Sequence, residues 1–166
     1  ASTKLDSLLA SGRFQAAGVN AAINNGNLVA LGAKDATQRE VYICTAPAAA
    51  TTPVYIVDGV EMQYSQETTQ GLNNYTNPAG ALLRLRRPQV GDHFAISARA
   101  ITALGLVPVV GNVVVTQAAA TTWNELAAPA GGESVVGTIE ESYVLGADPL
   151  GGRNITMYVI RITSVI

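Results

Sequence analysis

The chain has 166 residues and a net charge of -2 at pH 7, with 13% charged and 48% apolar residues. A chain of this length can bury a core without disulfides or metal ions, and its weak negative charge argues against nucleic acid and anionic membranes as partners. Its single cysteine, Cys44, excludes an internal disulfide and a four-cysteine zinc site.

Residues 1–20 predict an N-terminal arm. Ser2 or Thr3 can cap a short helix that places Leu5, Leu8 and Leu9 on one face. After Ser11-Gly12 the residues up to position 20 show neither a helical nor a strand period. We expect this arm either to become ordered against a neighbouring molecule or to pack on its own domain as irregular loop.

The start of the chain also bears on targeting. Lys4 is followed by LDSLLASGRF rather than by a long apolar segment, so we expect no signal peptide and synthesis in the cytoplasm. No stretch approaches the roughly 18 uninterrupted apolar residues of a membrane-spanning helix.

From residue 24 onward the pattern predicts β-structure. Asn, Gly and Pro punctuate short apolar runs, and residues 39–44 alternate polar and apolar side chains. For residues 121–126 we expect a helical turn or a wide loop, and for 97–110 a short strand followed by loop. The expected strands are residues 28–31, 39–44, 54–58, 61–64, 81–87, 93–96, 113–115, 135–141 and 154–166, the first two forming a hairpin.

These strands predict a mainly β fold. Short strands at intervals of roughly 8–15 residues are typical of a compact barrel- or sandwich-like domain of antiparallel strands with little helix. We assign residues 21–166 to this single domain, with a possible subdivision near 111–133, and residues 1–20 to the irregular arm.

The only basic cluster lies in the predicted strand 81–87. Alternation sends its leucines inward and sends Arg84 and Arg86 to the opposite face, with Arg87 following. Two arginines on one face can hold a carboxylate in bidentate fashion or contact a phosphate. Because the chain has little other positive charge, we favour ion pairs within the chain or between subunits over nucleic acid.

No residue pattern predicts a reaction centre. His93, the only histidine, is expected to be a hydrogen-bonded surface or rim residue, and Cys44 a small buried apolar residue. Glu140 and Glu141 are adjacent, so on a strand they point to opposite faces and make a poor acid-base pair; one of them is expected to form a rim salt bridge. We expect no catalytic, cofactor or metal site.

The low charge content suggests that the chain associates with other molecules. A globular domain usually has about twice this fraction of charged residues, and charge keeps soluble monomers apart. We therefore expect part of the surface to be covered by copies of the chain or by a partner. A monomeric domain rich in small residues is the alternative.

Four motifs in order resemble small head proteins of tailed bacteriophages. The segment AINNGNLVALG at residues 22–32 has an N-G turn leading into a strand that ends in L-G, and EVY follows at 40–42. The segment YTNPAG at 75–80 is followed by the basic Arg84, and Gly91-Asp92 precedes a strand. The similarity spans residues 22–96, about half of the chain, and does not extend to the segment from residue 111.

The resemblance implies a capsid decoration, or cement, protein. Such a β-rich, non-enzymatic subunit lies on the outside of an icosahedral shell and ties major capsid subunits together, as a homo-oligomer (trimer or dimer) without cofactor, nucleic acid or membrane. The segment from residue 111 would then hold an extra sheet layer or the oligomer contact. The expected capsid or subunit contacts are Leu5, Leu8, Leu9, Phe14, Tyr75, Asn77, Arg84, Arg86 and Arg87.

Two alternatives to this role stay open. Another virion component, such as a tail or head-completion subunit, would share the composition. A small β-barrel enzyme would need a pocket around His93, Cys44 or Glu61.

Overall fold

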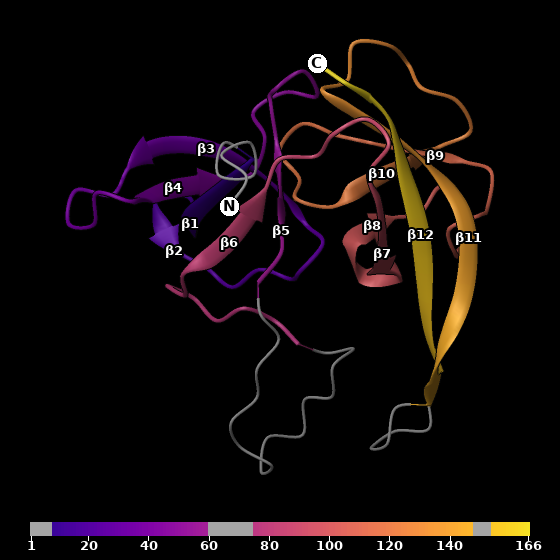
Figure 1. The fold of residues 1–166 in the computed structure, drawn as a ribbon, viewed down its shortest axis with the longest axis horizontal. Helices are drawn as coiled ribbons and strands as arrows, with labels where there is room; N and C mark the ends of the chain where they lie inside the picture. Colours follow the sequence, from indigo (N-terminus) through magenta and orange to yellow (C-terminus); the bar gives the residue numbers. More distant parts are fainter. Residues whose placement is uncertain (1–7, 60–74, 148–153) are drawn as a thin grey trace.

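A computed structural model describes residues 8–59, 75–147 and 154–166. The described residues form two six-stranded sheets and a short 3-10 helix, which confirms the predicted mainly β, barrel- or sandwich-like fold. Figure 1 shows the first sheet, built by strands β1 to β6, on the left and the second sheet, built by β7 to β12, on the right. The chain passes from one sheet to the other between residues 86 and 93.

The first sheet closes into a barrel. Its order is β2-β1-β4-β3-β5-β6, and an additional pairing of β1 with β6 closes the five strands other than β2. Buried residues of alternating positions, among them Val29, Cys44 and Leu85, fill the interior. The strands are β1 (Leu9–Ala16), β2 (Val19–Asn20), β3 (Leu28–Lys34), β4 (Val41–Thr45), β5 (Tyr55–Val57) and β6 (Leu83–Arg86).

The second sheet is open and curled, with the order β7-β12-β11-β9-β10-β8. A long hairpin of β11 and β12 forms its centre, and the shorter strands flank the hairpin on both sides (Figure 1). Its elements are β7 (His93–Ser97), the 3-10 helix η2 (Ala98–Ala100), β8 (Ile101–Thr102), β9 (Val113–Val115), β10 (Trp123–Leu126), β11 (Val135–Ala147) and β12 (Asn154–Val165).

The two sheets share a core. Leu28 and Ile56 of the first sheet pack in one buried cluster with Trp123 and Ile160 of the second. The Trp123 indole N–H donates a hydrogen bond of 2.9 Å to the carbonyl oxygen of Gly26. Gly26 has a φ of 81°, and a Cβ there would lie 2.8 Å from Ile96 of β7, so the turn before β3 needs glycine for both reasons.

The structure corrects the prediction of an irregular N-terminal arm. Residues 9–20 form β1 and β2, and β1 is a central barrel strand, parallel to β4 and antiparallel to β6. The inward positions of β1 are Ala10, Gly12 and Phe14, and a Cβ on Gly12 would collide with Cys44 Sγ and Leu85. Because these strands approach closely, position 12 requires a small residue. The sequence of β1 therefore lacks the alternation of large apolar and polar residues that predicts a strand. Residues 1–7, with Leu5 and the expected helix start, lie outside the described residues.

Most of the other predicted strands are confirmed, including the β3–β4 hairpin and the inward leucines and outward arginines of β6. The expected helical turn or loop at 121–126 is wrong, because residues 123–126 form β10. Two strand pairs, β1 with β4 and β10 with β8, are parallel rather than antiparallel. Residues 113–126 add two strands to the second sheet, and the expected strand 61–64 lies outside the described residues.

Candidate functional site

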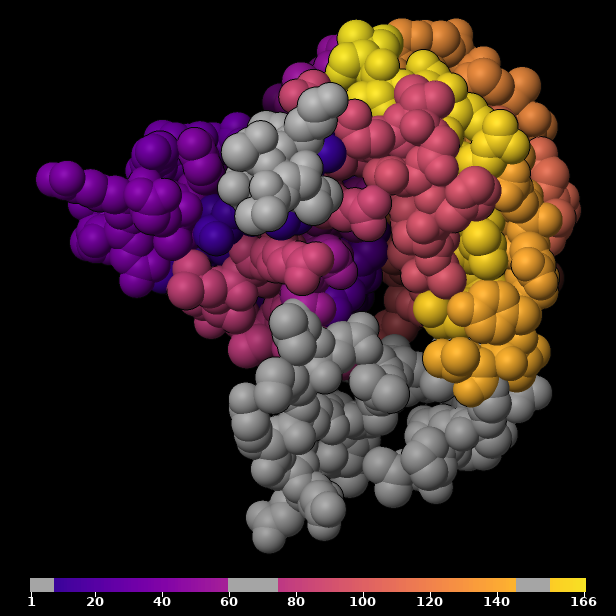
Figure 2. Space-filling model, in the orientation of Figure 1, coloured from indigo at the N-terminus to yellow at the C-terminus, as the bar shows by residue number. Residues whose placement is uncertain are grey.

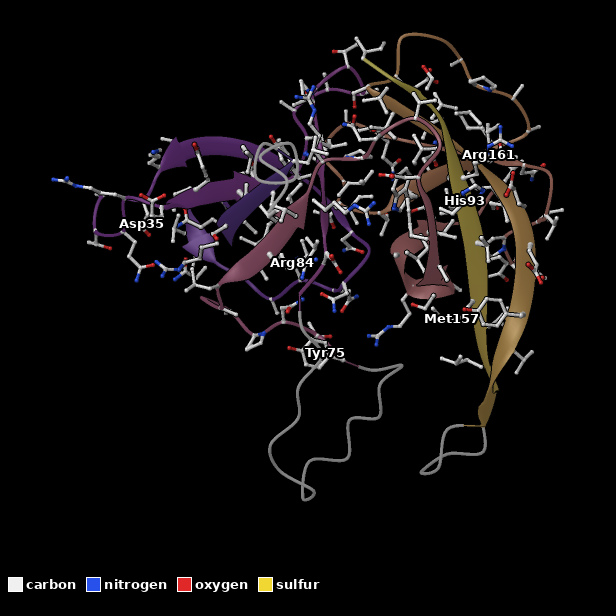
Figure 3. All side chains as sticks on the ribbon, viewed as in Figure 1. Asp35, Tyr75, Arg84, His93, Met157 and Arg161 are labelled. Atoms are coloured by element: carbon white, nitrogen blue, oxygen red, sulfur yellow. The ribbon has the colours of Figure 1, made fainter. Side chains whose placement is uncertain are left out.

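The side chains considered for catalysis on the second sheet form a hydrogen bond with one another, and one of them also forms an ion pair. His93 on β7 is exposed, and its Nε2 lies 3.1 Å from Glu140 Oε2, while Arg161 Nη1 on β12 lies 3.2 Å from Glu140 Oε1. His93 and Arg161 are labelled beside β12 in Figure 3. The predictions of a hydrogen-bonded surface histidine and of a salt bridge formed by one of the two adjacent glutamates are confirmed.

Cys44 is fully buried inside the barrel. Burial raises the pKa of its thiol to about 11, so the thiol stays protonated at neutral pH. A protonated, inaccessible thiol is a poor nucleophile, and the expected small buried residue is confirmed. Across the described residues, no three His, Cys, Asp or Glu side chains gather in a way that could hold a metal ion. The described ranges also contain no helix of the length and apolarity that a membrane span requires.

The arginines of β6 pair within the chain. Arg84 Nη2 lies 3.3 Å from Asp58 Oδ2, and Arg86 Nη2 lies 3.1 Å from Asp92 Oδ1. Both side chains are about half exposed and lie on the outer barrel face, where Figure 3 labels Arg84. The start of β1 adjoins them: Leu9 is opposite Arg86, and the Arg87 backbone N–H donates to the Leu8 carbonyl oxygen at 2.8 Å. Four of the expected contact residues, Leu8, Leu9, Arg86 and Arg87, therefore come together at one corner of the barrel.

The side chains of two other expected contact residues are buried and therefore inaccessible to a partner. Phe14 is 9% exposed and belongs to the barrel core. Asn77 is 3% exposed, and its side-chain amide donates to the Ile23 carbonyl oxygen at 3.1 Å and to Asn25 Oδ1 at 2.8 Å. Asn77 therefore ties two loops together, while Tyr75 beside it is half-buried.

A cavity of about 470 Å³ lies between the two sheets. Figure 2 shows the hollow on this face, between the barrel and β7. Ile56, Asp58 and Arg86 line it from the first sheet, and Phe94 and Met157 line it from the second. Neither His93 nor Cys44 lines this cavity, and Glu61 lies outside the described residues.

Most of the exposed large apolar residues in the described ranges lie on the second sheet. The loop between β8 and β9 carries five large apolar side chains that are 47–103% exposed, and we refer to residues 104–110 as the apolar loop. These side chains are Leu104, Leu106, Val107, Val109 and Val110. No residue of the apolar loop is charged. A group of exposed, uncharged apolar side chains of this kind is typical of a protein-binding site.

The buried carboxylate of Glu125 on β10 holds the apolar loop in place. Glu125 is 1% exposed and accepts hydrogen bonds from the backbone N–H groups of Leu104 at 2.8 Å and Val109 at 2.7 Å, and from the Asn112 amide at 2.8 Å. Burial raises the pKa of the Glu125 carboxyl, but these hydrogen bonds outweigh burial and leave the pKa below its ordinary value. The loop is thus pinned at both ends with its apolar side chains in solvent.

Beside the apolar loop, part of β11 pairs with another strand on one side only within the described ranges. Strand β9 pairs with β11 only at residues 136–138, and Ile139 bonds to Gly111 and Asn112, whereas β12 pairs along the length of β11. From residue 141 to 147, no strand in the described ranges pairs with the outer side of β11. We refer to residues 141–147 as the β11 edge. Figure 1 shows it at the outer right margin of the molecule.

Sequence analysis missed both surfaces. The signal for the apolar loop was present as LGLVPVV, an uncharged apolar run broken by Gly and Pro. The run was correctly placed in a loop, but its exposure follows from the bonds of Glu125, which lies 15 or more residues further on. Comparison of the chain with protein-family models, with curated proteins and with solved structures gave no match.

Proposed function

We propose that the protein is a non-enzymatic virion component that decorates and stabilises the outside of an icosahedral tailed-phage capsid by bridging major capsid subunits. The observation that carries the proposal is the apolar loop, a fully built surface of large apolar side chains held in solvent by Glu125. The order of the motifs in residues 22–96 supports the phage context. The low charge content supports association with other subunits.

The apolar loop suits a binding role for an energetic reason. Burying an exposed Leu or Val side chain contributes about 1.5–3 kcal/mol, and a loop that is already ordered loses little conformational freedom on binding. Leu106 is fully exposed and Val107 beside it is 62% exposed, so a partner that covers the loop can remove much of the solvent contact of both side chains. We assign these two residues the central contacts with the shell.

The corner formed by Leu9, Arg86 and Arg87 is the second proposed contact. Arg86 already pairs with Asp92, so it can bind a partner's carboxylate only by sharing or exchanging this bond. Exposed ion pairs contribute about 0–1 kcal/mol. Because this adds little to affinity, we assign the corner a role in orienting the chain on the shell. Many copies bound to one shell, as dimers or trimers, would convert such modest contacts into strong retention.

Co-sedimentation with expanded, DNA-free capsids that lack the protein tests this proposal. We expect saturable binding at a fixed ratio to the major capsid subunit and greater resistance of the shells to heat. We expect the double variant L106S/V107S to bind at least tenfold more weakly. The matched control is Val19→Ser, which changes a valine that is 70% exposed on β2, away from the apolar loop.

The outcome without binding is equally informative. Absence of binding to capsids at every maturation stage would overturn the decoration role, and binding to tail tubes would identify a different virion component. Equal retention of L106S/V107S and the wild-type chain would remove the apolar loop from the proposal.

A further inference from the structure

We propose that Asn25-Gly26 and Asp58-Gly59 are a pair of latent modification sites, at which reciprocal hydrogen bonds block succinimide formation in the folded chain and opening of these bonds releases it. The inference is independent of the capsid role, because it concerns the covalent chemistry of the chain itself. The first pair is the only Asn-Gly sequence in the chain, and the second is the only Asp-Gly sequence.

Both dipeptides are prone to the same reaction. The backbone nitrogen of the glycine attacks the side-chain Cγ of the preceding residue and loses its proton to solvent. The five-membered ring closes as ammonia leaves Asn25 or as water leaves Asp58. Water then opens one of the two C–N bonds of the succinimide and yields aspartate or isoaspartate. Glycine favours ring closure because no Cβ hinders the attacking nitrogen, and asparagine is a thermolabile residue.

The folded chain holds both reacting groups of the Asn-Gly pair. The Gly26 N–H donates to the Val57 carbonyl oxygen at 2.8 Å, and the Gly26 carbonyl oxygen accepts from Trp123 at 2.9 Å. The Asn25 amide Nδ2 donates to the Gly59 carbonyl oxygen at 3.0 Å. The attacking nitrogen and the amide that it would attack are therefore both engaged elsewhere.

The Asp-Gly pair is protected by the Asn-Gly pair. The Gly59 N–H donates to Asn25 Oδ1 at 3.1 Å, so the nitrogen that would attack Asp58 is bonded to the side chain that Gly26 would attack. Asn77 Nδ2 donates to the same oxygen at 2.8 Å and holds it in place. Loss of the Asn25 side chain would therefore remove the protection of Asp58.

Hydrogen bonds, rather than complete burial, carry this protection. All four residues of the two dipeptides line the cavity between the sheets, whose hollow is visible in Figure 2. Gly26 is buried, but Asn25, Asp58 and Gly59 are only half-buried. Opening of the bonds would therefore leave the reacting atoms accessible to water.

The fold requires glycine at both positions and so keeps the labile sequences. Gly26 has a φ of 81°, and a Cβ there would lie 2.8 Å from Ile96. A Cβ on Gly59 would lie 2.7 Å from Asn77 Oδ1 and 3.0 Å from Asn25 Oδ1. A bulkier residue, which would slow ring closure, is therefore excluded at either position unless its neighbours move.

Modification at Asn25 would in turn weaken the fold. Deamidation replaces the Nδ2 donor by a carboxylate oxygen, which then faces the Gly59 carbonyl oxygen, an acceptor without a proton to share. Isoaspartate also adds a methylene group to the main chain directly before Gly26, whose carbonyl oxygen bonds to Trp123 of the second sheet. A chain that reacts while unfolded is expected to refold to a less stable state.

The first test compares the folded and unfolded full-length chain. Both samples are incubated at the same mildly basic pH and temperature, one in buffer and one in guanidinium chloride, and peptide mapping by mass spectrometry follows aspartate and isoaspartate at positions 25 and 58. We expect both reactions to be at least tenfold slower in the folded chain. Equal rates in the two states, or no reaction in guanidinium chloride, would overturn the proposal.

Asn25→Ala tests the reciprocal protection, because this variant cannot deamidate at position 25 and reports on Asp58 alone. We expect isoaspartate at position 58 to form at least tenfold faster in folded N25A than in the folded wild-type chain. Asn24→Ala is the matched control, since Asn24 Oδ1 accepts from Thr76 Oγ1 at 2.7 Å and not from Gly59. An unchanged rate in N25A, or an equal increase in N24A, would overturn the proposed role of Asn25.

Hydrogen exchange of the wild-type chain provides a measurement that does not depend on the folding of a variant. We expect the backbone amides of Gly26 and Gly59 to be protected and to exchange together, because one opening event releases both. A Gly59 amide that exchanges as fast as in the unfolded chain would overturn the proposal.

Discussion

The barrel and the second sheet solve the problem of strand edges in different ways. The barrel closes on itself through β1 and β6, and ion pairs of Arg13, Arg84 and Arg86 decorate its outer face. The second sheet stays open, and the apolar loop and the β11 edge lie on it. The difference teaches that a chain with few charges can place most of its exposed large apolar side chains on one of its two sheets. Under the proposed function, the barrel would supply stability and orientation and the second sheet would supply the binding surface.

The comparison assumes that the barrel and the second sheet share one core and unfold together. Trp123 is fully buried in the shared core and bonds to Gly26. We expect Trp123→Ala to lower the free energy of unfolding by about 3–5 kcal/mol in a single cooperative transition, measured by urea denaturation. Trp123→Phe, which keeps most of the volume, should cost less. Separate transitions for the barrel and the second sheet would contradict the shared core.

Loss of the Glu125 carboxylate should have the next largest effect. Glu125→Ala removes the buried acceptor of three hydrogen bonds, and we expect the free energy of unfolding to fall by about 1–3 kcal/mol. Limited proteolysis should then cut within residues 104–110. Glu133→Ala is the matched control, because the Glu133 carboxylate accepts bonds from Ala130 and Gly131 in a different loop. Faster cleavage of the apolar loop in both variants would remove the specific role of Glu125.

The same carboxylate predicts a dependence on pH. The pKa of Glu125 is lower in the folded chain than its ordinary value, so its charge stabilises the folded state above the unfolded pKa of about 4.3. This contribution is lost as the pH falls through the folded pKa. We expect the difference in unfolding free energy between the wild-type chain and Glu125→Gln to be largest near pH 7 and to shrink below about pH 4. A constant difference over this range would show that ionisation of Glu125 does not contribute.

The smallest effect on stability is expected for the barrel arginines. Arg84 and Arg86 form exposed ion pairs with Asp58 and Asp92, and such pairs contribute about 0–1 kcal/mol. We expect the variant R84A/R86A to melt close to the wild-type temperature and to be retained less well on capsids in co-sedimentation. Unchanged retention would remove these arginines from the contact surface, and the comparison would then rest on the second sheet alone.

The sequence was sufficient to predict elements whose buried side chains are large and alternate. Strand β6 is the clearest case, because Leu83 and Leu85 point inward and Arg84 and Arg86 point outward. The turn at Gly26 and the buried state of Cys44 were predictable for similarly local reasons. The mainly β class followed from many such signals.

Local sequence patterns were insufficient to predict strands in which buried positions are occupied by small or charged residues instead of large apolar ones. Strand β1 has Ala10 and Gly12 at inward positions because neighbouring strands approach closely. Strand β10 buries the charged Glu125 because two backbone N–H donors of the apolar loop and the Asn112 amide surround its carboxylate. The β11 edge exists because β9 ends its pairing at Thr138. Each of these features depends on contacts between segments distant along the chain, so composition and turn signals predicted a β protein, while the packing of its strands determined where its exposed surface lies.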